Sequence, residues 1–385
     1  MNADVDTVMH LNNRLKPVLI GRVRKATAGL GLLLLLSLLT GCDQSAEHAS
    51  RSGFAGLDAS GEGFAEVLPG HILSFPEDHA PHPTFRTEWW YLTANLQGPD
   101  GTPYGVQWTL FRQPLDADTP RSGWQNQQLW MGHAAITSAE QHLHSETFAR
   151  GGIGQADVQL TPFHAWIDNW QLLSLADTGD DPLSNLHLEA TTETFSYQLN
   201  LTTDQQVVLQ GDQGFSLKSE QGQASYYYSQ PFFAAEGELQ IGDQVIPVTG
   251  QAWMDREWSS QWLAEGQQGW DWFSLHLETG EKLMLFQLRH TADKPFHSGT
   301  WISAEGDTEP LQDAVVIMTP LHHTPVAGKQ LPTAWEIEIP HRELKIQVSA
   351  LNPTAWMDTT YPYWEGPISI DGSHQGVGYL EMTGY

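Results

Sequence analysis

The chain has 385 residues, a length that favours two domains, and its 16 tryptophans and 35 glycines indicate a β-rich protein with aromatic cores and many turns. Only 18 residues are lysine or arginine against 46 aspartates and glutamates, so the formal net charge is -28 at pH 7. This deficit of cations argues against nucleic acid as a partner and against electrostatic attachment to an anionic membrane surface.

The first 41 residues have the pattern of a targeting segment. Basic residues between Arg14 and Lys25 precede an apolar run over 30–39, which is too short to span a bilayer comfortably. Leu-Thr-Gly-Cys42 resembles a bacterial lipoprotein box, which implies lipid attachment at Cys42, the only cysteine of the chain. Asp43 resembles the signal that keeps some bacterial lipoproteins on the inner membrane. We therefore expect a lipid-anchored protein of the bacterial cell envelope that faces the periplasm.

A proline-rich segment over 75–83 is expected to be extended or a loop, because its three prolines exclude helix. It contains His79 and His82, which with Asp78 and Glu88 could shuttle a proton or bind a metal. The Asp-His-x-x-His spacing is a weak metal signal outside a helix, so no metal is assigned. The alternative is that the histidines hold the segment over a barrel mouth through hydrogen bonds.

A β-hairpin is expected next, because Glu88–Leu96 and Tyr104–Arg112 are strand-like and a glycine-containing turn separates them. Further strand-sized runs follow without a long amphipathic helix, which favours an antiparallel barrel or sandwich. These runs are Trp130–Thr137, Ser145–Ala149, His164–Trp170, Leu186–Ala190 and Thr194–Leu201.

The two halves of the chain share a sequence pattern. Trp89–Leu96 matches Trp270–Leu277 in the order of aromatic, apolar and polar residues, and Gly250–Asp255 matches Gly376–Glu381 in the same way. Such a repeat is typical of two similar structural units. Generic strand chemistry could produce the same pattern, and this remains the alternative.

The repeat and the composition together predict four segments. Residues 1–41 are the targeting segment, and 42–63, rich in Ser, Ala and Gly, form a flexible tether. The N-terminal β domain is expected over 64–258 and the C-terminal one over 263–385.

The densest chemistry lies in Gly250–Trp258 and Gly269–Trp272, which together contain four tryptophans and three carboxylates. If Ala252–Trp258 is extended, Trp253, Asp255 and Glu257 share one face. Burial against a tryptophan disfavours the charged form of a carboxylate and raises its pKa. This stretch is therefore the first candidate site.

Acid catalysis is the sharper hypothesis for this stretch. A protonated Asp255 or Glu257 could donate a proton to a carbon–carbon double bond, and tryptophan faces could stabilise the carbocation. The alternative is that both acids pair with Arg256, Arg289 or Arg112 and tie the two domains together.

Glu88 is a further candidate, because it begins a strand where a barrel cavity would open; a salt bridge with Arg112 or Arg86 is its alternative role. The candidate catalytic residues are thus Asp255, Glu257 and Glu88. The candidate ligand-binding residues are Trp89, Trp90, Trp253, Trp258, Trp270, Trp272, His79 and His82.

Several of these motifs together resemble the AttH-like and carotenoid 1,2-hydratase-like family, over about residues 64–385. They are Phe75–His79 with His82, Glu88–Tyr91, Gln107–Arg112, Gly250–Trp258, Gly269–Trp272 and Gly376–Tyr385. The resemblance implies two lipocalin-like barrels packed together and a long apolar substrate. The family includes hydratases of carotenoid end groups, but a shared fold does not fix a shared reaction.

The prediction is an all-β protein with two lipocalin-like antiparallel β-barrel domains that binds a hydrophobic, isoprenoid- or lipid-like molecule. As a hydratase, lyase or isomerase it would convert that molecule by acid–base chemistry; a non-catalytic lipophile carrier or envelope scaffold is the alternative. No cofactor is expected. The sequence has no phosphate-binding glycine loop, no Gly-x-Ser-x-Gly motif and no cysteine cluster, which disfavours a hydrolase or a nucleotide-dependent enzyme.

Overall fold

The computed structural model describes residues 62–117, 121–311 and 315–385, which belong to one compact unit. The targeting segment, Cys42, Asp43 and nearly all of the tether lie outside these residues. The described part is built of β-strands and three short 3₁₀-helices, η2 (Glu77–His79), η3 (Gly123–Gln125) and η5 (Pro340–Arg342). No helix in these ranges is long and apolar enough to cross a membrane.

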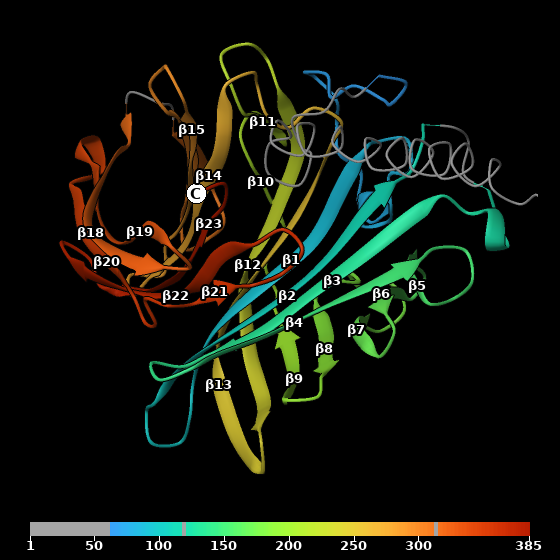
Figure 1. The fold of residues 1–385 in the computed structure, drawn as a ribbon, viewed down its shortest axis with the longest axis horizontal. Coiled ribbons are helices and arrows are strands. Elements are labelled where there is room, and N and C mark those ends of the chain that lie inside the picture. Colours follow the sequence, from blue (N-terminus) through green and yellow to red (C-terminus); the bar gives the residue numbers. More distant parts are fainter. Residues whose placement is uncertain (1–61, 118–120, 312–314) are drawn as a thin grey trace, which may run out of the picture. The chain divides into compact units, whose positions relative to one another are not determined.

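The first antiparallel sheet has thirteen strands in the order β4-β3-β2-β1-β13-β12-β9-β8-β7-β6-β5, with β10 and β11 paired to β12 (Figure 1). Its strands are β1 (Thr87–Gln97), β2 (Pro103–Pro114), β3 (Gln128–Thr137), β4 (His142–Arg150), β5 (Ala156–Leu160), β6 (Phe163–Ile167), β7 (Trp170–Ser174), β8 (Asn185–Thr191), β9 (Phe195–Thr202), β10 (Val208–Leu209), β11 (Phe215–Leu217), β12 (Ala224–Ile241) and β13 (Gln244–Ser259).

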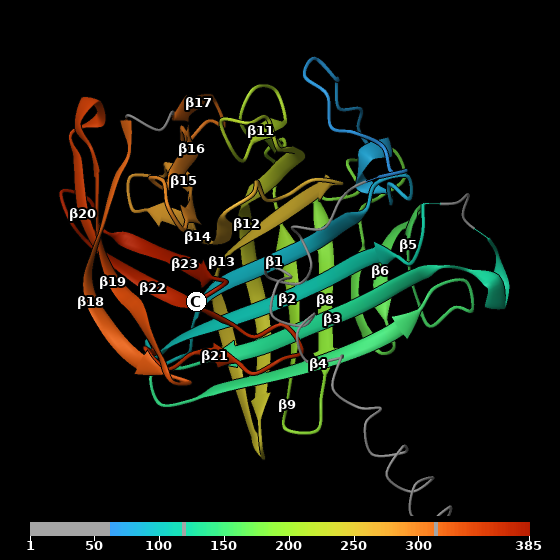
Figure 2. The same ribbon diagram turned by 45° about the horizontal axis from the view of Figure 1, so that its top comes forward.

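The second sheet has ten strands in the order β17-β16-β15-β14-β23-β22-β20-β19-β18, with β21 paired to β22, and it curls round on itself (Figures 1 and 2). Its strands are β14 (Gln267–Leu277), β15 (Lys282–His290), β16 (Phe296–Ile302), β17 (Thr308–Leu311), β18 (Ile317–Val326), β19 (Lys329–Ile339), β20 (Leu344–Ala350), β21 (Trp356–Met357), β22 (Tyr363–Gly372) and β23 (Gly376–Met382). The predicted fold class, all-β with two barrel-like antiparallel sheets, is confirmed.

The predicted hairpin is present as β1 and β2, with Glu88 opposite Arg112. The expected single strand over His164–Trp170 is wrong, because the chain turns there between β6 and β7. Asp168 in this turn has a φ of 52°, a left-handed conformation that aspartate tolerates better than most residues.

The internal repeat corresponds to a repeated strand arrangement. In the first sheet β1 lies between β2 and β13, and in the second β14 lies between β15 and β23. Tyr91 of β1 faces Asp255 of β13, and Trp272 of β14 faces Glu381 of β23, at matching positions of the two halves. The two sheets therefore offer equivalent strands at equivalent places.

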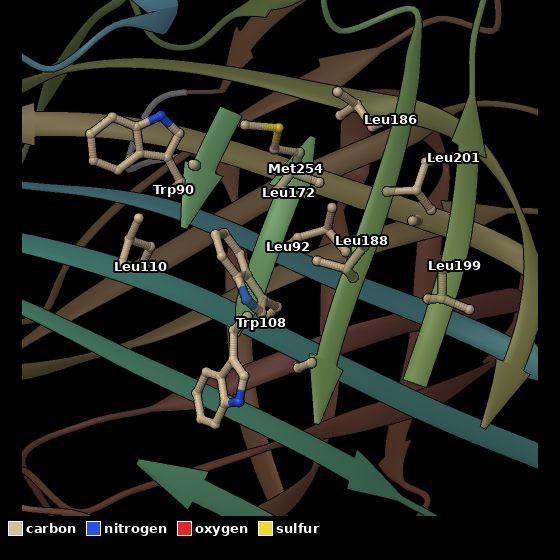
Figure 3. Packing of buried hydrophobic residues seen from close by; sticks show 14 of the residues in the cluster. Trp90, Leu92, Trp108, Leu110, Leu172, Leu186, Leu188, Leu199, Leu201 and Met254 are labelled. Carbon is tan, nitrogen blue, oxygen red and sulfur yellow. The ribbon is translucent and has the colours of Figure 1, made fainter. Parts of the chain in front are cut away.

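Three large apolar clusters organise the packing. The first lies inside the first sheet, where Trp90, Leu92 and Trp108 pack with leucines of β7 to β9 (Figure 3). The second lies inside the second sheet and includes Phe273 and Trp335. The third contains residues of both sheets, so alternate side chains of β1 and β14 face either a barrel core or the other sheet. The candidate site lies at this third cluster.

Side chains of the second sheet pack directly against the backbone of Gly105 in the first. A Cβ atom on Gly105 of β2 would lie 2.6 Å from the ring of Pro367 and 2.7 Å from the Tyr379 hydroxyl, both in the second sheet. The side-chain amide of Asn95 donates to the Gly378 carbonyl at 2.8 Å. Glycine at position 105 therefore lets the two sheets pack directly.

Candidate functional site

A cavity of about 120 Å³ lies between the two sheets. Residues of β1, β2, β3, β12 and β13 line one side, and residues of β14, β15, β22 and β23 line the other. Its wall is largely aromatic and includes Trp89, Tyr91, Trp262, Trp270, Trp272 and Phe286. Three carboxyl groups interrupt this wall, those of Asp255, Glu257 and Glu381. A concave aromatic site with a few converging polar groups is the usual form of a small-molecule site.

The two halves of the chain contribute equivalent residues to this cavity. By the repeat, Trp89 corresponds to Trp270, and both line it. Asp255 corresponds in the same way to Glu381. The cavity is thus built from the repeated hairpin and the repeated closing strand, one copy from each sheet.

Asp255 is buried and accepts three hydrogen bonds. Ser229 and Trp253 donate to its Oδ1 at 2.5 and 2.6 Å, and Tyr227 donates to its Oδ2 at 2.7 Å. Burial raises the pKa of Asp255 to about 7, although the three donors oppose the shift and the nearby Glu257 adds to it. This carboxyl therefore holds a proton over the lower part of the neutral range.

Glu381 is the second cavity carboxyl with a raised pKa. The indole N–H of Trp270 donates to its Oε1 at 2.5 Å. Burial raises the pKa of Glu381 to about 7 against this hydrogen bond, and the charges of Asp255 and Glu257 raise it further. Two carboxyl groups, one from each sheet, can thus each gain or lose a proton near neutral pH.

Glu365 lies behind the cavity wall, opposite Glu381 on the neighbouring strand. The Tyr91 hydroxyl donates to its Oε1 at 2.5 Å, while its Oε2 has no hydrogen-bond partner among the described residues. Burial and the charge of Glu381 raise the pKa of Glu365 well above its usual range. An ionised oxygen left without a partner would be costly, so the neutral acid is favoured.

Glu257 has a different environment from Asp255. Its Oε1 lies 2.6 Å from the Nζ of Lys218, and the Ser225 hydroxyl also donates to it. Lys218 in turn lies 4.3 Å from the centre of the Phe286 ring. Glu257 is therefore paired with a lysine, beside two acids whose pKa values are raised to about 7.

The arginines expected to neutralise Asp255 and Glu257 pair with other acids. Glu88 is fully buried between Arg112 and Arg256, and the Arg256 Nη2 lies 2.5 Å from its Oε2. Burial acts to raise the pKa of Glu88, but the two guanidinium charges outweigh it and hold that pKa well below its usual range. The alternative that Asp255 and Glu257 pair with these arginines is thus wrong. For Glu88, the alternative role of a salt bridge with Arg112 is the one that the structure shows.

Arg289 of the second sheet also pairs with a buried carboxylate outside the candidate acids. The Nη1 of Arg289 lies 2.6 Å from Oδ1 of the fully buried Asp271. Arg289, Arg112 and Arg256 are therefore all engaged with carboxylates other than Asp255 and Glu257.

The candidate tryptophans divide between two faces. Trp89, Trp270 and Trp272 line the cavity, and Trp253 supports it by donating to Asp255. Trp90 and Trp258 instead belong to the core of the first sheet. Along β1 and β13 successive side chains alternate, which explains why neighbours in sequence separate in space.

The two candidate histidines also lie on the core side of the first sheet. His82 stacks on Trp258 with ring centres 3.9 Å apart, and its backbone N–H donates to Glu88 at 2.8 Å. His79 is buried 2.6 Å from the Tyr228 hydroxyl. The structure therefore does not bring His79, His82 or Glu88 to the cavity, and no group of metal-ligating side chains occurs among the described residues.

Sequence reasoning missed several residues of this site. The repeat could have predicted Glu381, because it aligns this residue with Asp255. The repeat likewise aligns Tyr91 with Trp272, whereas Lys218, Tyr363 and His133 carry no comparable pattern, because they join the site only when the sheets pack.

Comparisons with known proteins agree with this architecture. The chain is 33% identical to an AttH protein of Nitrosomonas europaea in its crystal structure, with a TM-score of 0.73 over 84% of this chain and all of that one. Kievitone hydratase from Nectria haematococca shares the fold at 17% identity, with a TM-score of 0.61 over 84% of this chain and 97% of that chain.

A curated relative is the protein named dehydratase asqC of Emericella nidulans. It is 27% identical over 136 residues, which span 33% of this chain and 38% of that protein. The profile of the AttH-like family matches residues 66–385. The chain belongs to the AttH-like family, with its lipocalin-like pair of β-barrels.

Proposed function

We propose that this protein adds water to, or removes it from, a carbon–carbon double bond of a hydrophobic small molecule bound between the two sheets. One observation carries the proposal: Asp255 and Glu381 face the same aromatic cavity, and burial raises the pKa of each to about 7. A general acid works best with a pKa near the operating pH.

The reaction would begin with proton transfer from one carboxyl to an alkene carbon. The faces of Trp89, Trp270 and Trp272 can stabilise the resulting carbocation. Water then forms a carbon–oxygen bond and returns one proton to a carboxylate of the cavity, so the net change is the addition of one water molecule. The reverse sequence removes water, and the relative named a dehydratase supports a reaction of this class.

The lining also restricts the substrate. Aromatic side chains suit an isoprenoid- or lipid-like skeleton, and three carboxyls beside Lys218 disfavour an anionic group near the reacting atoms. We therefore propose an uncharged, mostly apolar substrate that carries a double bond or a hydroxyl group.

Isotope labelling tests this function. The purified protein is incubated in water enriched in oxygen-18 with a lipid extract of the cell envelope, and the products are analysed by mass spectrometry. The wild type should place label in one apolar compound, whereas Asp255→Asn and Glu381→Gln should not. Asp157→Asn is the control, since Asp157 is an exposed aspartate on β5 and lies outside the cavity lining. Unlabelled lipid bound equally by all the proteins would indicate a carrier instead.

We also propose that the chain is attached to the envelope by a lipid at Cys42, because Leu-Thr-Gly-Cys resembles a lipoprotein box. Cells grown with a labelled fatty acid should label the wild-type chain and not Cys42→Ser. Labelling of Cys42→Ser at the wild-type level would disprove the anchor. Fractionation of the two membranes then tests the inner-membrane location suggested by Asp43.

A further inference from the structure

A row of hydrogen-bonding side chains connects the buried Glu365 with the protein surface. We propose that Tyr363, His133 and Glu146 form a proton relay that exchanges the proton of Glu365 with solvent. The relay would resupply the acids of the proposed reaction, but its existence does not depend on that reaction. Glu146 is the surface end and Glu365 the buried store.

The relay crosses from one sheet to the other through short contacts. The Nδ1 of His133 lies 3.0 Å from the Tyr363 hydroxyl, and its Nε2 lies 3.1 Å from Oε1 of Glu146. Tyr363 also hydrogen-bonds with Glu365. His133 and Glu146 are directly opposite on β3 and β4, while Tyr363 and Glu365 lie two positions apart on one face of β22.

Burial distinguishes the two ends. The side chains of Glu365 and His133 are each 1% exposed, whereas that of Glu146 is 17% exposed. Glu146 accepts hydrogen bonds from the backbone N–H and the hydroxyl of Thr360, in a contact that reaches solvent. Water can therefore protonate Glu146 but has no comparable access to Glu365.

A proton can pass along the row from one group to the next. A proton bound at Glu146 moves to Nε2 of His133, the proton on Nδ1 moves to the Tyr363 oxygen, and the Tyr363 proton moves to the Glu365 carboxylate. The neutral imidazole that remains carries its proton on the other nitrogen, and Glu146 is again a carboxylate. One proton has entered from solvent and one has reached Glu365.

Two tyrosines connect Glu365 with the cavity. Tyr91 and Tyr363 both line the cavity and both hydrogen-bond with Glu365. Glu365 thus stands behind the phenol groups that a bound substrate would contact. A purely structural row joining the two sheets would need the same contacts, so the test must follow protons rather than stability.

Infrared spectroscopy follows the proton directly. A protonated carboxyl has its own carbonyl band, which shifts when the proton is replaced by deuterium, and Glu365→Gln assigns the band by removing it. After transfer to D₂O, the wild-type band should shift quickly. In Glu146→Gln and His133→Phe the band should shift at roughly one tenth of the wild-type rate or more slowly still, because exchange then requires local opening of the sheets.

Glu309→Gln is the matched control, since Glu309 contacts His341 at 2.9 Å in an exposed pair unconnected with the cavity. Equal exchange rates in wild type and Glu146→Gln would overturn the relay, and so would the absence of a Glu365 carboxylic acid band. Glu146→Gln alters a half-buried edge residue and keeps the test valid if His133→Phe does not fold. The exchange needs no substrate, so a failed labelling assay with normal relay exchange would reject only the proposed reaction.

Discussion

Replacing Asp255 with asparagine should make the protein more stable above neutral pH. The pKa of Asp255 is about 7 in the folded protein against an ordinary value of 3.8, so between these values the folded state holds a proton that the unfolded state has lost. Linkage then lowers the free energy of unfolding as pH rises through this window. Over the interval from pH 5 to pH 8 the loss amounts to about 3 kcal/mol.

Asparagine keeps the size of the side chain and has no proton to lose. Its carbonyl oxygen can accept from Ser229 and Trp253 as Oδ1 does, and its amide can donate to the Tyr227 oxygen. The difference in unfolding free energy between Asp255→Asn and wild type should therefore grow by about 3 kcal/mol from pH 5 to pH 8. Contributions from groups that both proteins share cancel in this difference.

Urea denaturation at the two pH values measures this difference. Asp271→Asn is the contrasting control, because Asp271 is equally buried but is paired with Arg289. Its neutralisation should lower stability by a similar amount at both pH values. A difference between Asp255→Asn and wild type that stays constant with pH would refute the protonated state of Asp255 and with it the proposed acid.

Three further predictions concern other parts of the structure. Glu88→Gln should cost about 3–5 kcal/mol of stability, because two buried guanidinium groups lose their counter-charge; a loss within experimental error in urea denaturation would contradict this. Gly105→Ala should cost about 1–3 kcal/mol in thermal unfolding, because the new methyl group overlaps Pro367; an unchanged midpoint would show that the sheets yield freely. Hydration by the wild type should fall as pH rises through about 7, where Asp255 and Glu381 lose their protons, and a rate that rises there in a pH profile would exclude both as the acid.

The sequence predicted the fold well because its signals are local. Alternation along β13 placed Trp253, Asp255 and Glu257 on one face, and the structure brings all three to the third apolar cluster and its cavity. The repeat predicted two equivalent hairpins with equivalent partners. These inferences need only the period of a strand and the comparison of one half with the other.

The site was only partly predictable because both faces of its strands are buried. Trp89 and Trp90 are adjacent and chemically alike, yet one faces the cavity and the other the core of the first sheet. Alternation separates two such residues but cannot say which face meets the second sheet. His133 and Lys218 became site residues only through packing between distant strands, which leaves no mark in the local sequence.

The equivalent positions of both acids in one chain have a consequence for how such a site can change. A symmetric dimer of single barrels would present two copies of one acid in one setting, so a mutation would alter both together. In a single chain each copy varies alone. Asp255 faces Ser229 across its strand pair, whereas Glu381 faces Glu365 at the corresponding place. In a single chain one half can thus carry a second buried carboxyl beside its acid while the other carries a compact set of hydrogen-bond donors, a difference that a symmetric dimer could not have.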